Sequence, residues 1–302
     1  MSNSLECNST ARSLLIHAVK KQIKLREQDE WKKELPERCP PILWFGNAET
    51  KKPIILTVAA NPSRKEYLNE TPESALKKVK NNEPLNYRET PNNRFRVLNQ
   101  TEELADILND QQLQDEIING YNFYFYPQDE RYTAYTKWFG MNKPDSYNVE
   151  GFLRGFGASY YPNNNLSYQA VHIDLFPFAT LSNFKCLLEN ENINEEDLFG
   201  NNWAANFIQS LITMLQPSSL ILFGRTNFNY FSQYIDSSIS QTIWQGYGCA
   251  SYCIGGAIKV ELPFIGLSTN LGNPKCFTAA SLNQYGQHIQ QEVLRSHPNH
   301  TQ

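Results

Sequence analysis

The stretch that decides the fold lies at residues 53–67 and reads PIILTVAANPSRKEY. Its first part is an unbroken apolar run, and such runs are typical of strands that are buried on both faces of a parallel sheet. We therefore predict a strand at residues 54–60. The polar turn Asn61-Pro62-Ser63 follows directly, because proline cannot continue a central strand.

The turn leads into a predicted helix. Ser63 and Glu66 have the S-x-x-E spacing of a capping box, in which each side chain accepts a hydrogen bond from a backbone amide of the first turn. A helix is therefore expected from Arg64. Ser63 is explained as a helix cap and Pro62 as the end of the strand. Asn61 is therefore the residue of this turn that is the candidate for a functional role. A neutral amide is no general base, but it can hold a water molecule in line for attack.

The rest of the chain alternates between apolar runs and amphipathic segments. Strands are predicted at residues 169–175, 219–223 and 264–267, and helices at residues 9–35, 102–118, 148–156, 194–215, 226–235 and 278–294. This alternation predicts a doubly wound α/β fold, in which ligands bind beyond the carboxyl ends of the strands. Residues 1–40 are predicted to form a helical arm on one domain at residues 41–302, with a long polar, partly helical insertion at about 69–147.

The charge of the chain is unevenly distributed. The 302 residues carry a formal net charge of −4, which argues against broad coating of nucleic acid. Residues 51–96 differ, since ten Lys and Arg residues stand there against five acids. This segment could contact phosphates, and an ordinary solvated surface is the alternative. Ser63, Arg64 and Lys65 are the candidate phosphate contacts.

Several classes of site lack their sequence signals. Six scattered cysteines form no C-x-x-C pair and are expected to be reduced thiols in a cytoplasmic protein. No apolar run reaches the roughly 18 residues of a membrane span. No cofactor is predicted, because a phosphate-binding loop and a dinucleotide-binding glycine motif are both missing. No metal is predicted, because the late histidines, among them His297 and His300, lie in a tail.

Polar residues also stand at the ends of the other predicted strands. His172 and Asp174 share one face of the second strand if its side chains alternate. A buried carboxylate such as Asp174 needs a partner or a task, and His172 is the nearest candidate partner. Phe176 supplies a ring just beyond this strand. Ser268 and Asn270 lie in the polar turn after the last strand.

These strand ends resemble the motifs of the uracil-DNA glycosylase superfamily, in particular an uncharacterised bacterial branch with an NPS-type first motif. That motif, NPS-x-x-E-[FY], corresponds to residues 61–67, and an aromatic WF segment corresponds to Trp138-Phe139. A strand of the form H-x-D-L corresponds to residues 172–175. LILFGRTNF at residues 220–228 is similar to the strand and helix before the last motif. The resemblance covers most of residues 50–295 as short motifs in order.

The resemblance implies a three-layer α/β/α sandwich with a central, mainly parallel, four-stranded sheet. It also implies hydrolysis of a base–sugar N-glycosidic bond in DNA, with the target base flipped into a pocket. Asn61 would orient the attacking water, and Asp174 would recognise the base. The implied base-binding residues are Tyr67, His172, Phe176, Ser268 and Asn270, with Tyr67 or Phe176 stacking on the base.

Two positions depart from the superfamily's motifs. Leu267 precedes Ser268 where a histidine usually stabilises the leaving base, and such a loss is often worth about 3 kcal/mol of barrier. Asp174 stands where several members have asparagine, and an ionised carboxylate only accepts hydrogen bonds. We therefore predict a DNA glycosylase-like enzyme that is not a standard uracil-excising enzyme. The alternatives are a non-catalytic nucleotide or nucleic-acid binding protein on the same fold, and a domain that acts through protein contacts.

Overall fold

The computed structural model describes residues 2–88, 95–126, 136–143, 145–163, 165–200, 202–257, 262–274 and 276–296. The chain divides into two compact units. Unit 1 comprises residues 1–45, 60–133 and 174–214, and unit 2 comprises residues 46–59, 134–173 and 215–302. Residues 1–40, predicted to be an arm, are thus grouped with later segments of unit 1. The division does not follow the predicted boundary at residue 40.

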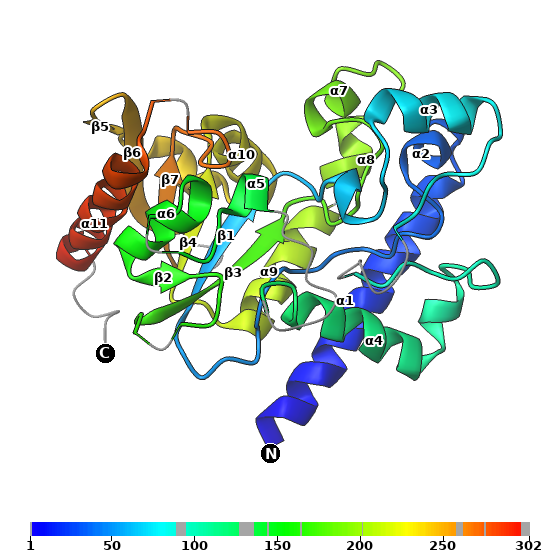
Figure 1. The fold of residues 1–302 in the computed structure, drawn as a ribbon, viewed down its shortest axis with the longest axis horizontal. Coiled ribbons are helices and arrows are strands. Elements are labelled where there is room, and N and C mark those ends of the chain that lie inside the picture. Colours follow the sequence, from blue (N-terminus) through cyan, green and yellow to red (C-terminus); the bar gives the residue numbers. More distant parts are fainter. Residues whose placement is uncertain are drawn as a thin grey trace. The chain divides into compact units, whose positions relative to one another are not determined.

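Unit 2 is built on a seven-stranded sheet with the order β2-β3-β1-β4-β7-β6-β5 (Figure 1). The strands are β1 Ile54–Ala59, β2 Ala158–Ser159, β3 Tyr168–Asp174, β4 Ser219–Phe223, β5 Gln245–Tyr247, β6 Ala250–Ala257 and β7 Leu262–Leu267. β2 with β3, β1 with β4 and β4 with β7 pair in parallel, whereas β6 pairs antiparallel with β5 and β7. The α/β class is confirmed, but the sheet has seven strands of mixed direction instead of four.

The four predicted strands are the central neighbours β3, β1, β4 and β7, each ending within two residues of its predicted bounds. Every residue of β4 is buried, and so are the first five residues of β1. Continuous burial is what an unbroken apolar run requires, because a strand covered on both faces has no solvent-facing side. Asp174, the last residue of β3, is counted with unit 1.

The helices of unit 2 include a close glycine crossing. They are α5 Thr136–Phe139, α6 Asn148–Phe156, α10 Arg225–Tyr230, the π-helical turn η3 Phe231–Ile235, the 3-10 turn η4 Ser237–Gln241 and α11 Ala279–Ser296. A Cβ atom on Gly155 of α6 would lie 1.9 Å from the carbonyl oxygen of Asn283. One on Gly286 of α11 would lie 2.0 Å from that of Phe152. The two backbones approach this closely because neither glycine carries a side chain.

Unit 1 is mostly helical, and several of its helices are shorter than predicted. Its elements are α1 Ser2–Arg26, α2 Asp29–Glu34, η1 Arg64–Glu66, α3 Pro72–Lys80, η2 Asp106–Leu108, α4 Gln111–Asn122, α7 Phe184–Leu188, α8 Glu195–Phe199 and α9 Trp203–Leu215. The single helix predicted at residues 194–215 is two helices, because the chain leaves α8 at Gly200 in an extended conformation. Parts of the predicted insertion at 69–147 lie outside the described residues.

The predicted capping box forms at Ser63 but not at Glu66. The Ser63 hydroxyl accepts a hydrogen bond from the Lys65 amide at 3.3 Å, as a cap should. The element it caps is only a 3-10 turn, Arg64–Glu66. Both carboxylate oxygens of Glu66 lie 3.0 Å from the Tyr124 hydroxyl. Glu66 therefore packs in the core of unit 1, where it is 8% exposed.

One pair of cysteines also departs from expectation. Cys249 and Cys276 in unit 2 form a disulfide, so the prediction that all six cysteines are reduced is wrong for this pair. It joins the β5–β6 hairpin to the segment after β7. The described free thiols are Cys39, Cys186 and Cys253. Within the described ranges, no helix is both long and apolar enough to cross a membrane.

Substitution of Gly286 tests the glycine crossing. Gly286→Ala places a methyl group 2.0 Å from a backbone oxygen of α6, so we expect the free energy of unfolding to fall by about 2 kcal/mol, the usual scale of overpacking. Gly256→Ala is the matched control, because no atom lies within 4 Å of its Cβ position. Denaturant unfolding measures both variants. Equal stability of the two would contradict the crossing.

Candidate functional site

Asn61 lies in unit 1, where its segment runs beside residues 174–180. The Phe176 amide donates to the Ala60 carbonyl at 2.9 Å, and Ser63 forms a parallel bridge with Thr180. The Asn61 side chain is half-buried, and its Nδ2 donates to the Thr180 hydroxyl at 2.9 Å and towards the Phe178 carbonyl at 3.5 Å. Both hydrogen bonds of the Asn61 side chain are therefore made by its nitrogen.

The Thr180 hydroxyl decides which way this amide faces. It donates its only proton to the Ser182 carbonyl at 2.8 Å, so it can only accept from Asn61. A backbone carbonyl such as that of Phe178 also only accepts. Both neighbours therefore require the nitrogen of the Asn61 amide and exclude its oxygen. Oδ1 faces away from them and has no hydrogen-bond partner among the described residues.

The carboxylate of Glu34 holds Ser182, the residue whose carbonyl accepts the proton of Thr180. Glu34, at the end of α2, is 6% exposed and accepts from the Ser182 amide at 2.9 Å and its hydroxyl at 2.7 Å. The Leu181 amide donates to the Glu34 carbonyl at 2.9 Å. A chain of hydrogen bonds therefore runs from Glu34 through Ser182 and Thr180 to Asn61, all within unit 1.

The two rings predicted to stack on a base lie in the core of unit 1. Tyr67 is 1% exposed and donates to the Pro40 carbonyl at 2.7 Å, and burial raises its pKa well above the ordinary value. Phe176 is fully buried, with ring centroids 5.6 Å from Trp31 and 4.8 Å from Phe178. In this arrangement both rings stabilise the core and present no free face to a ligand.

The remaining predicted residues of unit 1 differ in exposure. Asp174 is 3% exposed, so a role in recognising a base stays a prediction. Arg64 is 8% exposed and donates from Nε to the Glu70 carbonyl at 3.1 Å. Ser63 is engaged as a cap, and Lys65 is exposed. Lys65 is therefore the predicted phosphate contact with a charge that faces solvent.

His172 belongs to unit 2 and lies in its core. It is 2% exposed, and Nδ1 lies 2.9 Å from the Thr57 hydroxyl, which lies 2.6 Å from the Tyr160 hydroxyl. The Trp138 and Phe139 rings flank the imidazole, with centroids 5.0 and 5.3 Å away. His172 is thus packed in the core of unit 2, and its role in binding a base stays a prediction.

The turn after β7 is held by its own hydrogen bonds. The Ser268 hydroxyl accepts from the Ser251 amide at 2.7 Å, and Asn270 Oδ1 accepts from the Gly272 amide at 3.0 Å. Asn270 is exposed. A Cβ atom on Gly272 would lie 2.1 Å from two atoms of the Trp138 indole, so the ring rests directly on the turn. The prediction that these residues act with Asn61 stays a prediction, since they belong to unit 2.

Glu150 of α6 is a buried titratable group in unit 2 that the sequence did not single out. It is fully buried and accepts hydrogen bonds from Arg154 Nε at 2.8 Å, the Ser159 hydroxyl at 2.6 Å and the Tyr160 amide at 3.2 Å. Burial raises its pKa to about 7, because loss of water disfavours the carboxylate more than these donors stabilise it.

Comparison with known proteins adds no assignment, since no protein-family model and no curated protein matches the chain. Among the described residues, no group of three or more His, Cys, Asp or Glu side chains is placed to hold a metal ion. His297 and His300 lie outside those residues. The sequence analysis did not single out Thr180, Ser182 or Glu34. For Thr180 and Ser182 the available signal is a pair of small hydroxyl residues soon after the second predicted strand, and Glu34 has no such signal.

The raised pKa of Glu150 gives unit 2 a pH-dependent stability. An unfolded glutamate titrates near 4.5 and the folded one near 7, so the folded state binds the extra proton between these values. Its contribution to the free energy of unfolding is therefore full below about pH 4.5 and falls, by about 3 kcal/mol, as the pH rises through 7.

Glu150→Gln should remove this fall, because the amide stays neutral. The effect is measured by denaturant unfolding at about one-unit steps of pH between pH 5 and pH 8. Asp145→Asn is the control, since the Asp145 side chain is 78% exposed. Identical pH profiles for the wild type and Glu150→Gln would contradict the raised pKa.

Proposed function

We propose that the protein hydrolyses the N-glycosidic bond of a nucleobase in DNA, on a three-layer fold like that of the uracil-DNA glycosylases. The observation that supports this most is the Asn61 amide. Thr180 and Phe178 hold its nitrogen, and its oxygen has no partner in the described part of the chain. An oxygen fixed in this way can hold a water molecule by one hydrogen bond. Positioning of a reactant is a large source of rate.

The reaction needs no proton transfer to Asn61. The oxygen of the held water forms a bond to C1′ of the sugar as the bond from C1′ to the base nitrogen breaks. The electron pair leaves with the base, and the proton of the water passes to solvent or to the departing base. Asn61 accepts a hydrogen bond throughout, which is all that a neutral amide oxygen can do.

Two charged residues of unit 1, Lys65 and Asp174, are the groups that this proposal assigns to the phosphate and to the base. Lys65 stands four residues after Asn61 with its ammonium exposed, and a cation there suits a phosphate. Asp174 would accept hydrogen bonds from an exocyclic amine or a protonated ring nitrogen, and it disfavours the carbonyl of uracil at that position. Tyr67 and Phe176 have no part in this proposal, because both are buried in the core.

The test is a glycosylase assay on short DNA strands and duplexes that carry uracil, hypoxanthine, xanthine or a mismatched base. Alkali cleaves the abasic product, which a gel then resolves. Wild-type protein should produce alkali-labile sites with at least one of these bases. Asn61→Ala should lower the rate by about 100-fold and Thr180→Val by about tenfold, because each removes or loosens the water-holding oxygen.

Matched controls lie on the exposed face of α9. Asn206→Ala and Thr213→Val change the same residue types in unit 1 at exposed positions, and both should keep the wild-type rate. If the wild type bound DNA and cleaved none of these substrates, the proposal would be contradicted. That outcome is what the alternative, a non-catalytic nucleotide or nucleic-acid binding protein, predicts.

A further inference from the structure

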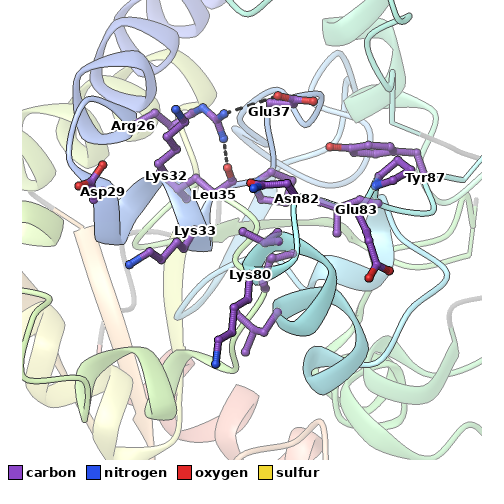
Figure 2. Close-up of a pocket in the computed structure, with 16 residues that line it drawn as sticks. Arg26, Asp29, Lys32, Lys33, Leu35, Glu37, Lys80, Asn82, Glu83 and Tyr87 are labelled. Atoms are coloured by element: carbon purple, nitrogen blue, oxygen red, sulfur yellow. Dashed lines mark hydrogen bonds and ion pairs between the residues drawn. The ribbon is translucent and has the colours of Figure 1, made fainter.

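A pocket of about 830 Å³ lies within unit 1, between α2, α3 and the segment that follows α3 (Figure 2). Pockets that bind small organic ligands usually have volumes of roughly 300–1,000 Å³, so this one has room for such a ligand. Asn61, Thr180, Ser182 and Glu34 do not line it, although Leu181, whose amide donates to the Glu34 carbonyl, does. The ligand of this pocket is therefore distinct from the substrate of the proposed hydrolysis.

The walls of the pocket are mainly apolar. Leu76 and Val79 stand three residues apart on α3, so both face the same side of the helix. Leu35 follows α2, Leu85 comes from the segment after α3, and Leu181 also lines the pocket. Burial of a hydrocarbon against such walls is favourable by about 25 cal/mol per Å² of apolar surface. The walls therefore favour a ligand with an apolar body.

Arg26 supplies a half-buried charge, and its neighbours accept only part of its hydrogen-bonding capacity. Its side chain is 17% exposed, and one terminal nitrogen donates to the Leu35 carbonyl. Glu37 lies 3.9 Å from the other, too far for a hydrogen bond, and is itself 70% exposed. A guanidinium has five N–H donors, and no other hydrogen bond from Arg26 is made within the described ranges. Desolvation lowers the pKa of Arg26, as expected for a cation short of partners.

The other charges that line the pocket limit the ligand to a small anionic head. Four basic residues line it against three acids, so the lining suits a single negative charge better than a polyanion such as a nucleoside polyphosphate. The basic residues are Arg26, Lys32, Lys33 and Lys80, and the acids are Asp29, Glu37 and Glu83. Figure 2 shows the Glu83 carboxylate and the Lys80 ammonium pointing away from Arg26. Lys32, Lys33 and Lys80 are exposed, so Arg26 is the least exposed cation of the lining. A carboxylate also matches the fork of a guanidinium.

We propose that this pocket binds a small organic monoanion with an apolar body, such as a medium-chain carboxylate, with its head on Arg26 and its chain between Leu76, Val79 and Leu85. The carboxylate accepts hydrogen bonds from the N–H groups of Arg26 that have no acceptor among the described residues. The chain replaces water against the leucine and valine side chains.

The experiment is isothermal titration of the full chain with decanoate, kept below the concentration at which it forms micelles. Decyltrimethylammonium and decanol, which have the same chain with a cationic and a neutral head, are the matched ligands. We expect decanoate to bind at least about tenfold more tightly than either, since a charge-assisted hydrogen bond adds roughly this much. Absence of decanoate binding, or equal binding of the three ligands, would overturn the proposal.

Variants separate the head from the chain. Arg26→Gln should weaken decanoate about tenfold and leave decanol unchanged, and Arg26→Lys should restore part of the loss because it restores the charge. Val79→Glu should abolish binding, because it places a carboxylate in the apolar wall. Lys77→Gln, on the exposed face of α3, is the control and should bind as the wild type does. Unchanged decanoate affinity in Arg26→Gln or in Val79→Glu, with a wild-type circular dichroism spectrum, would assign the binding to another surface.

Discussion

The single proton of the Thr180 hydroxyl is the constraint on which the candidate site depends. Because that proton is given to the Ser182 carbonyl, Thr180 can meet only the nitrogen of the Asn61 amide, and the oxygen must face the other way. Ser182 is in turn held by the buried carboxylate of Glu34. The direction of one amide is therefore set by a residue 148 positions away from Ser182 in the sequence. In a mechanism that relies on positioning, such a fixed orientation is available before any ligand binds.

The two units are stabilised in different ways. Unit 2 has a sheet whose central strands are buried along their length, a glycine crossing between α6 and α11, and a buried carboxylate on α6 with a raised pKa. Unit 1 relies on helices, aromatic packing and hydrogen bonds between segments far apart in the sequence, such as Arg12 with Asp115 at 2.8 Å. It also contains both the Asn61 amide and the pocket beside Arg26. Asn61 and Thr180 lie in segments between regular elements, a common arrangement because loops carry function.

The sequence predicted what depends on local pattern. The central strands were predicted almost to their ends because burial on both faces requires a continuous apolar run. β2 and β5, with two and three residues, are too short to show any pattern. Tyr67 and Phe176 were assigned to a base pocket because core rings and pocket rings have the same composition, and only the fold separates them. The partnership of Asn61 with Thr180 and the disulfide between Cys249 and Cys276 join residues 119 and 27 positions apart, and no spacing rule predicts either.

Solvent exchange of the Asn61 side-chain amide protons, followed by nuclear magnetic resonance on labelled protein without ligand, tests directly whether this amide is fixed. The Nδ2 protons donate to Thr180 and Phe178, so at least one should exchange well over tenfold more slowly than those of the exposed Asn206. Exchange as fast as that of Asn206 would show that the amide turns freely. It would contradict the claim that the oxygen of Asn61 is held ready for a water molecule.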